Sequence, residues 1–190
     1  GFAAPKGGLN MPGPTLYAEV GDVLVVHFRN ADTKLRQAVT LAGVRQILFF
    51  SASGLAALSP EDGRVYWRHP WKTDYDVNAA TPIFLAPDKL FVSSGYDTGS
   101  ALLQINRTNV TEVWRSRGMK NQFSSSVLHN GHIYGFDDSV LKCISAATGE
   151  EKWKESGLGH GSLILADGHL VVLSERGPSS STPLRASLRE

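Results

Sequence analysis

The chain has 190 residues, which is long enough for one substantial hydrophobic core or two small ones. Its 19 Lys and Arg against 18 Asp and Glu leave a formal net charge of +1, without the basic runs typical of nucleic-acid-binding proteins. One cysteine, Cys143, excludes an internal disulfide framework, and the longest weakly polar run, 47–58, is too short to span a bilayer. We therefore expect a globular chain with no nucleic-acid partner and no membrane span.

The first predicted element is a hairpin at 12–30, with the sequence PGPTLYAEVGDVLVVHFRN. It resembles the opening hairpin of a cupredoxin domain in multicopper oxidases, so residues 1–33 are expected to form a cupredoxin-like hairpin segment. That family holds copper with His-x-His pairs after the hairpin, and this sequence contains no His-x-His. The resemblance therefore does not support a copper site.

The segment 34–50, KLRQAVTLAGVRQILFF, is ambiguous between one helix and two strands. Gly43 and the β-rich ILFF that follows favour two strands. From there to residue 177, short apolar runs alternate with Gly, Asn, Asp and Pro, which predicts an all-β architecture.

An internal repeat organises the region 38–177. Trp recurs at positions 67, 114 and 153, and an apolar strand position recurs at intervals of 43, 43 and 37: Leu48, Phe91, Tyr134 and Val171. A period near forty with four short strands per unit is typical of a β-propeller blade. The Trp side chains are expected to fill the seams between blades.

In each repeat, the turn before the last strand requires a residue tolerant of positive φ. Gly63 and Gly149 occupy this place four residues before their Trp. In the middle copy, Asn109 lies one position earlier relative to Trp114, and we expect it to substitute for the glycine.

These repeats resemble the PQQ-like β-propeller repeat family, whose units end in apolar–Asp–turn–Thr–Gly–x–x–x–Trp. CISAATGEEKW matches well, ALSPEDGRVYW moderately and QINRTNVTEVW weakly, with Ser145, Ser59 and Asn106 in place of the usual Asp. The family includes quinoprotein dehydrogenases and the propeller lipoprotein of the outer-membrane β-barrel assembly machinery. The resemblance implies a periplasmic or secreted protein.

Residues 38–177 predict a partial propeller of three to four blades, whereas propellers usually close with four to eight. An unclosed propeller exposes sheet edges that can pair with another chain. Three explanations remain open: the hairpin at 15–30 completes the fold, the chain forms a homo-oligomer through open blade edges, or the sequence is an excerpt of a longer protein. Residues 178–190 are predicted to be a disordered polar tail.

Acidic residues follow the second predicted strand of several repeats: Asp97, Asp137, Asp138 and Glu175. Carboxylates are Ca²⁺ ligands, so Asp97, Asp137 and Glu175 are a candidate metal set, with ordinary turn acids as the alternative. His129 and His132 have a His-x-x-His spacing that suits a metal pair, or are exposed turn residues. His132, Asp137 and Asp138 are the candidate catalytic residues.

No complete catalytic constellation is recognisable, so the favoured function is a non-catalytic binding or assembly module with a protein partner or a small ligand. The alternative is a Ca²⁺-dependent hydrolase of lactonase type, with its site at the propeller centre, by analogy with other propellers. A quinoprotein or copper oxidoreductase is the weaker alternative. PQQ is not supported, because quinoprotein dehydrogenases commonly use a vicinal disulfide that one cysteine cannot form.

Overall fold

The computed structural model describes residues 39–107 and 109–176. The predicted hairpin at 12–30, the segment 1–33 that contains it and the predicted tail at 178–190 lie outside these residues. The described part is all-β apart from one short 3-10 helix, η1 (Asp74–Asp76). None of its helices has the length and apolar character needed to cross a membrane.

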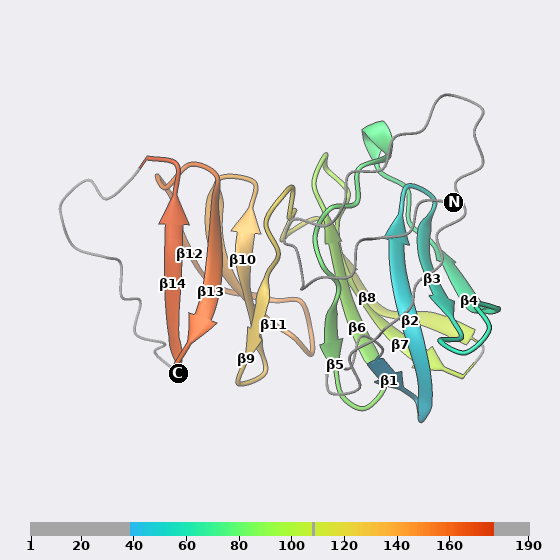
Figure 1. The fold of residues 1–190 in the computed structure, drawn as a ribbon. Coiled ribbons are helices and arrows are strands. Elements are labelled where there is room, and N and C mark those ends of the chain that lie inside the picture. Colours follow the sequence, from blue (N-terminus) through green and yellow to red (C-terminus); the bar gives the residue numbers. More distant parts are fainter. Residues whose placement is uncertain (1–38, 108, 177–190) are drawn as a thin grey trace, which may run out of the picture. The chain divides into compact units, whose positions relative to one another are not determined.

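The strands form four antiparallel sheets in chain order, which we call blades 1 to 4 (Figure 1). Blade 1 contains β1 (Val39–Leu41), β2 (Val44–Ser51), β3 (Gly54–Leu58) and β4 (Val65–Pro70). Blade 2 contains β5 (Ile83–Leu85), β6 (Lys89–Ser94), β7 (Gly99–Asn106) and β8 (Asn109–Ser116). Blade 3 contains β9 (Val127–His129), β10 (His132–Asp137), β11 (Val140–Ser145) and β12 (Glu151–Glu155). Blade 4 contains β13 (Gly161–Ala166) and β14 (His169–Ser174).

This architecture confirms the prediction of an all-β chain with three to four propeller-type blades. The ambiguous segment forms two strands, β1 and β2, as expected. Ala42 and Gly43 connect them, with φ angles of 49° and 75°. Positive φ at both central residues is the geometry of a two-residue hairpin turn, and it explains why a helix does not continue through Gly43.

The turns before the last strands of blades 1 and 3 are built alike. In blade 1 the Ser59 amide donates to the Arg64 carbonyl at 2.8 Å, and the Gly63 amide donates to the Ser59 carbonyl at 3.0 Å. Ser145 and Gly149 make the two equivalent bonds in blade 3, at 2.9 and 2.8 Å. Gly63 and Gly149 have φ angles of 74° and 73°, so both glycines serve the turn as predicted.

The equivalent turn in blade 2 is different, and the prediction for Asn109 is wrong. Asn109 is the first residue of β8 and pairs directly with Asn106, so the loop between them has only two residues. Arg107, rather than Asn109, has a positive φ, of 20°. A shorter hairpin replaces the glycine turn, which explains why this copy of the repeat matches the family least.

The three Trp residues lie at blade seams, as predicted. Each Trp directly follows a register shift in the pairing of the third and fourth strands of its blade. Trp67 pairs with Ala57, Trp114 with Leu102 and Trp153 with Cys143. Trp67, Trp114 and Trp153 each contact a separate apolar cluster that joins consecutive blades. The Trp114 indole also donates to the Ala146 carbonyl of blade 3 at 3.2 Å. The seams are therefore large apolar contacts that repeat along the chain.

Candidate functional site

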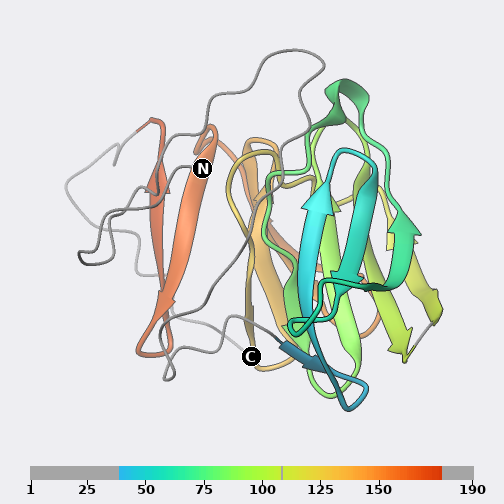
Figure 2. The ribbon, with the colours of Figure 1, turned by 45° about the vertical axis from the view of Figure 1, so that its right-hand side comes forward.

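Because consecutive strands of a blade run in opposite directions, the chain turns alternately at the two ends of the blade (Figures 1 and 2). The ends of the second strands, the turns that follow them and the connections between blades lie at one end, which we call the loop end. It comprises 52–53, 71–82, 95–98, 117–126, 138–139 and 156–160. The repeated glycine turns and the turns after the first strands lie at the other, the hairpin end. The loop end differs from blade to blade, whereas the hairpin end largely repeats.

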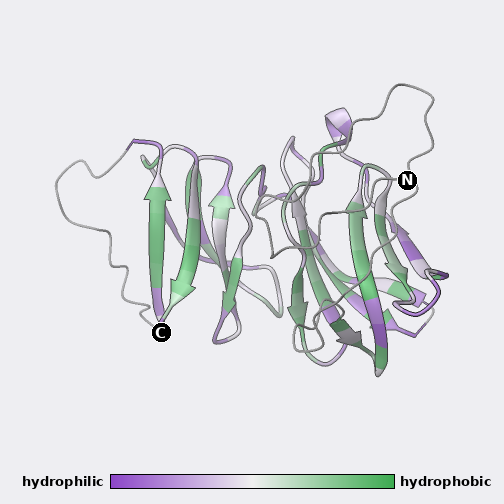
Figure 3. Cartoon of the chain, viewed as in Figure 1, coloured by the Kyte–Doolittle hydropathy of each residue, from purple (hydrophilic) through white to green (hydrophobic). Residues whose placement is uncertain are grey.

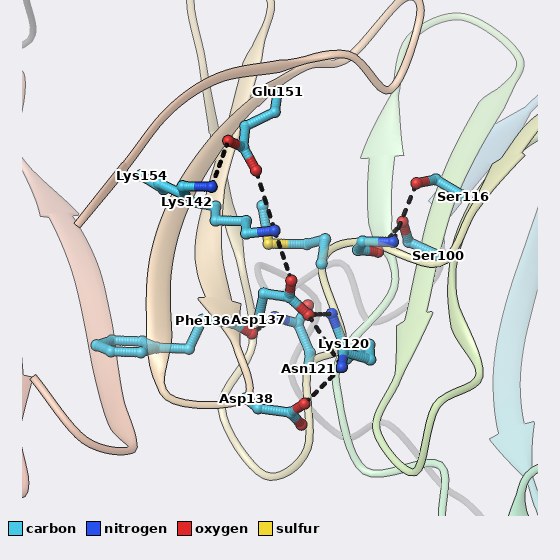
Figure 4. Close-up of polar contacts among 12 residues, drawn as sticks. Ser100, Ser116, Lys120, Asn121, Phe136, Asp137, Asp138, Lys142, Glu151 and Lys154 are labelled. Carbon is cyan, nitrogen blue, oxygen red and sulfur yellow. Dashed lines mark hydrogen bonds and ion pairs between the residues drawn. The ribbon is translucent and has the colours of Figure 1, made fainter. Parts of the chain in front are cut away.

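Three of the predicted acidic residues converge on Lys120 at the loop end, and Figure 4 shows two of them, Asp137 and Asp138. Lys120 Nζ lies 2.7 Å from Asp138 Oδ2, 3.4 Å from Asp97 Oδ1 and 3.9 Å from Asp137 Oδ1. The Lys120 amide also donates to Asp137 Oδ1 at 3.0 Å. The hydrogen bond to Asp138 raises the pKa of Lys120, so the ammonium stays charged between the carboxylates.

A second lysine continues this network into blade 3. Lys142 Nζ lies 2.7 Å from Asp137 Oδ2 and 3.0 Å from Glu151 Oε2. Burial acts to lower the pKa of Lys142, but its hydrogen bonds to Asp137 and Glu151 outweigh burial and raise it. The Asp137 side chain is only 10% exposed, and the two lysines supply its ion pairs.

The predicted calcium set is only partly assembled. Asp97 and Asp137 share Lys120, whereas Glu175 lies after β14, where it accepts from the His160 amide at 3.0 Å. Within residues 39–107 and 109–176, no group of three or more His, Cys, Asp or Glu side chains is arranged to hold a metal ion. The carboxylates that come together there are paired with ammonium groups.

The predicted histidines lie at the hairpin end. His129 and His132 pair across the two-residue turn of β9 and β10. His132 Nδ1 lies 2.9 Å from the Asn130 carbonyl, and His169 makes the equivalent contact with Asp167 in blade 4 at 2.7 Å. His132 and Asp137 occupy opposite ends of β10, about 17 Å apart at the usual strand rise. The structure therefore does not bring His132 together with Asp137 and Asp138.

A solvent-open hollow of about 730 Å³ lies at the loop end between blades 1 and 2. Its lining comes from the 71–82 connection, the β6–β7 turn and the end of β8: Lys72, Thr73, Asp74, Tyr96, Asp97, Thr98, Arg115, Ser116 and Arg117. Lys72 and Arg117 make no ion pair with any residue that the structure describes. The hollow therefore offers a ligand two cations that have no ion-pair partner among residues 39–107 and 109–176.

The wall of the hollow is held rigid by Arg115. Its guanidinium stacks over the Trp71 ring at 4.3 Å and makes two hydrogen bonds to Glu112, at 3.0 and 2.5 Å. These bonds raise the pKa of Arg115 and lower the pKa of Glu112. His69 lies 3.4 Å from Glu112, and burial lowers the pKa of its imidazole.

An aromatic pair lies beside the hollow, with Tyr75 exposed and Tyr96 half-buried. The rings of Tyr75, on η1, and Tyr96 are 5.2 Å apart, and Tyr75 is 82% exposed. Both have positive φ, 65° and 52°, a conformation that costs a bulky residue about 1–2 kcal/mol. Strained, exposed aromatic residues are typical of binding surfaces rather than of packing.

Sequence reasoning missed the residues that organise the loop end. Lys120 and Lys142 pair with three of the predicted acids, Asp97, Asp137 and Asp138. Asn78 and Asn121 tie the connections to the blades: Asn78 Nδ2 donates to the Ser51 carbonyl at 2.8 Å, and Asn121 Nδ2 donates to the Phe136 carbonyl at 3.0 Å. The two asparagines are 43 residues apart, the interval of the repeat, and this spacing could have identified them.

Comparison with known proteins gives a family match and matches to solved structures. Residues 18–177 match the family described as outer membrane protein assembly factor BamB. The crystal structure of BamB from Moraxella catarrhalis matches with 16% identity and a TM-score of 0.46, over 72% of this chain and 42% of that one. The chain thus spans less than half the length of that structure, and a search of curated proteins finds no match. Since the family match covers most of its 190 residues, the chain belongs to the PQQ-like β-propeller repeat family described as outer membrane protein assembly factor BamB.

Proposed function

We propose that the chain is a non-catalytic, extracytoplasmic binding module that serves the assembly of outer-membrane proteins. The family description supports the assembly role, and the family resemblance supports a periplasmic setting. The observation that carries the proposal is the Tyr75–Tyr96 pair beside an open hollow whose Lys72 and Arg117 have no ion-pair partner within the described part of the chain. The partner is a protein that docks on the loop end.

The chemistry of this surface suits a polypeptide. Aromatic side chains are enriched among the residues that dominate protein–protein affinity, because they bury a large area with few rotatable bonds. Lys72 and Arg117 would pair with carboxylates of the partner, while Asp74 and Asp97 on the same lining would meet its cations. The Trp71–Arg115 stack keeps the wall in place, so little order has to be gained on binding.

No arrangement among the described residues favours the Ca²⁺-dependent hydrolase. Asp97 and Asp137 share Lys120, and Asp137 also pairs with Lys142. A cation would have to displace an ammonium group that is already hydrogen-bonded.

Binding to an outer-membrane β-barrel protein, diluted from urea and still unfolded, tests the proposal. The immobilised chain should bind this probe, and the double variant Tyr75→Ala/Tyr96→Ala should bind it at least about tenfold more weakly, the loss of one binding hot spot. Val113→Ala, which shortens an exposed apolar side chain on β8, is the matched control and should bind like the unaltered chain. Absence of binding, or equal binding by the double variant, would refute the proposal.

A further inference from the structure

A second hollow, of about 210 Å³, lies at the loop end between blades 3 and 4. We call it the second hollow, and the hollow between blades 1 and 2 the first hollow. Pockets for drug-sized ligands measure about 300–1,000 Å³, so the second hollow has the size for one large side chain. Its lining includes residues of the 117–126 connection, of the end of β10 and of the entry to blade 4: Gln122, Phe123, Phe136, Asp138, His160 and Gly161.

Two phenylalanine rings give the second hollow its apolar character. Phe136 is 2% exposed, and a Cβ on Gly161 would lie 2.5 Å from its ring, so the glycine leaves the ring its room. Phe123, on the connection, is 71% exposed. Figure 3 shows β13, whose first residues line this hollow, as largely apolar, whereas η1 beside the first hollow is hydrophilic. Aromatic rings pack favourably edge-to-face or offset against one another, so an aromatic side chain suits the second hollow.

The charged groups of the second hollow already have partners. Asp138 Oδ2 lies 2.7 Å from Lys120 Nζ, and His160 Nδ1 lies 3.4 Å from Glu175 Oε2. In the first hollow, by contrast, two cations have no ion-pair partner among residues 39–107 and 109–176. Since an unpaired charge is costly to bury, the second hollow favours an uncharged side chain, while the first favours a carboxylate.

The two hollows meet at Lys120. Its ammonium group lies 3.4 Å from Asp97 of the first lining and 2.7 Å from Asp138 of the second. The connections that line the hollows are also joined to each other, because the Thr81 amide donates to Ser125 Oγ at 2.9 Å. The hollows are therefore neighbouring parts of one surface, held together by contacts within the chain.

The spacing of the aromatic residues indicates how long a segment must be to reach both hollows. A Cβ on Gly95 would lie 3.2 Å from Gln122 Cα, so the β6–β7 turn touches the 117–126 connection. Tyr96 and Phe123 are the next residues along the chain, which places their Cα atoms within roughly 12 Å of each other. An extended polypeptide covers that distance in about four residues.

We propose that the second hollow receives one aromatic side chain of a polypeptide whose acidic residue, about four positions away, pairs with Lys72 and Arg117 in the first hollow. The inference rests on the binding function proposed above and names the segment that the loop end recognises. Blades pack side against side at the seams of this chain, so a further blade at either end of the sequence would not cover the loop end.

A cycle of variants in the chain and in a peptide tests the second hollow. The probe is a fluorescent peptide of Ser and Thr that carries one Glu and one Phe four positions apart, and its binding is measured by anisotropy. Replacing the peptide's Phe by Ala should weaken binding to the unaltered chain about tenfold. In Phe123→Ala the same replacement should change binding less than about twofold, because the ring that contacts the peptide's Phe is gone.

Two controls separate the second hollow from the first. Replacing the peptide's Glu by Gln should weaken binding equally to the unaltered chain and to Phe123→Ala, since the first hollow is the same in both. Val113→Ala, which shortens an exposed side chain of β8, should respond to both peptide changes like the unaltered chain. Circular dichroism verifies that each variant is folded.

The outcomes distinguish this inference from the proposed function. A peptide that does not bind, or one whose Phe replacement costs the same in the unaltered chain and in Phe123→Ala, would overturn the second hollow as a binding site. The proposed function fails separately, when the unfolded β-barrel protein does not bind or when it binds Tyr75→Ala/Tyr96→Ala as tightly as the unaltered chain.

Discussion

The turns at the hairpin end repeat from blade to blade, whereas the connections at the loop end differ. At the hairpin end, blades 1 and 3 repeat the same turn bonds, and His132 and His169 make the same contact one blade apart. At the loop end, the connection after blade 1 lines an open hollow and carries the exposed Tyr75, while the connection after blade 2 carries Lys120, which pairs with three carboxylates. Repetition thus marks architecture, and the surface available for binding lies where the blades differ.

The largest expected effect on stability comes from replacing a turn glycine at the hairpin end, and its size should differ between the two turns. A Cβ at Gly149 would lie 2.8 Å from the Trp114 ring, whereas a Cβ at Gly63 would have no atom within 4 Å. Both positions have positive φ, so Gly63→Ala should cost about 1 kcal/mol in the free energy of unfolding. Gly149→Ala should cost about 3 kcal/mol, because strain at the seam is added. Urea unfolding measures both, and equal losses would mean that Trp114 is not fixed at the seam.

Removing a buried counterion should have the next largest effect. Lys142→Met leaves the nearly buried Asp137 carboxylate with a weaker partner, and should lower the free energy of unfolding by about 2 kcal/mol. Lys152→Met removes an exposed pair with Glu150 and should leave the urea midpoint close to that of the unaltered chain. If both variants unfold at the same urea concentration, the network at the loop end contributes no more than a surface pair.

A smaller effect is expected from pH. Burial lowers the pKa of His69, so the folded chain binds fewer protons than the unfolded chain just below the ordinary value of about 6.5. The stability contributed by neutral His69 is complete above that value and falls as the pH drops toward the folded-state pKa. Urea unfolding between pH 7.5 and 5.5 should show this decline, and His69→Gln should reduce it. An identical decline in His69→Gln would assign the effect to other groups.

The smallest effect is expected from calcium. Because Lys120 and Lys142 already pair with Asp97 and Asp137, added Ca²⁺ should leave the melting temperature unchanged. A rise in melting temperature that disappears in Asp137→Asn would instead support the metal-dependent hydrolase.

The sequence predicts the turns and seams that recur in each blade, but it predicts little of the ion pairs and the hollow that the loop-end connections form. Trp114 and Gly149 recur at fixed intervals because every blade needs a turn and a seam, so a single chain reveals them. The pairing of Asp137 with Lys120 depends on how the 117–126 connection folds back on blade 3, and no spacing encodes that. His132 and Asp137 are close in sequence but separated by the length of β10. The hollow between blades 1 and 2 arises from three segments without periodicity, and the sequence therefore gave no sign of it.

Hydrogen exchange of the chain with and without the unfolded β-barrel protein tests the central claim most directly. Protection is expected at the loop end, in 72–76, 95–98 and 115–118, with no change at the hairpin-end turns 42–43 and 130–131. Protection confined to the hairpin end, or no protection in the presence of bound partner, would contradict the assignment of binding to the loop end.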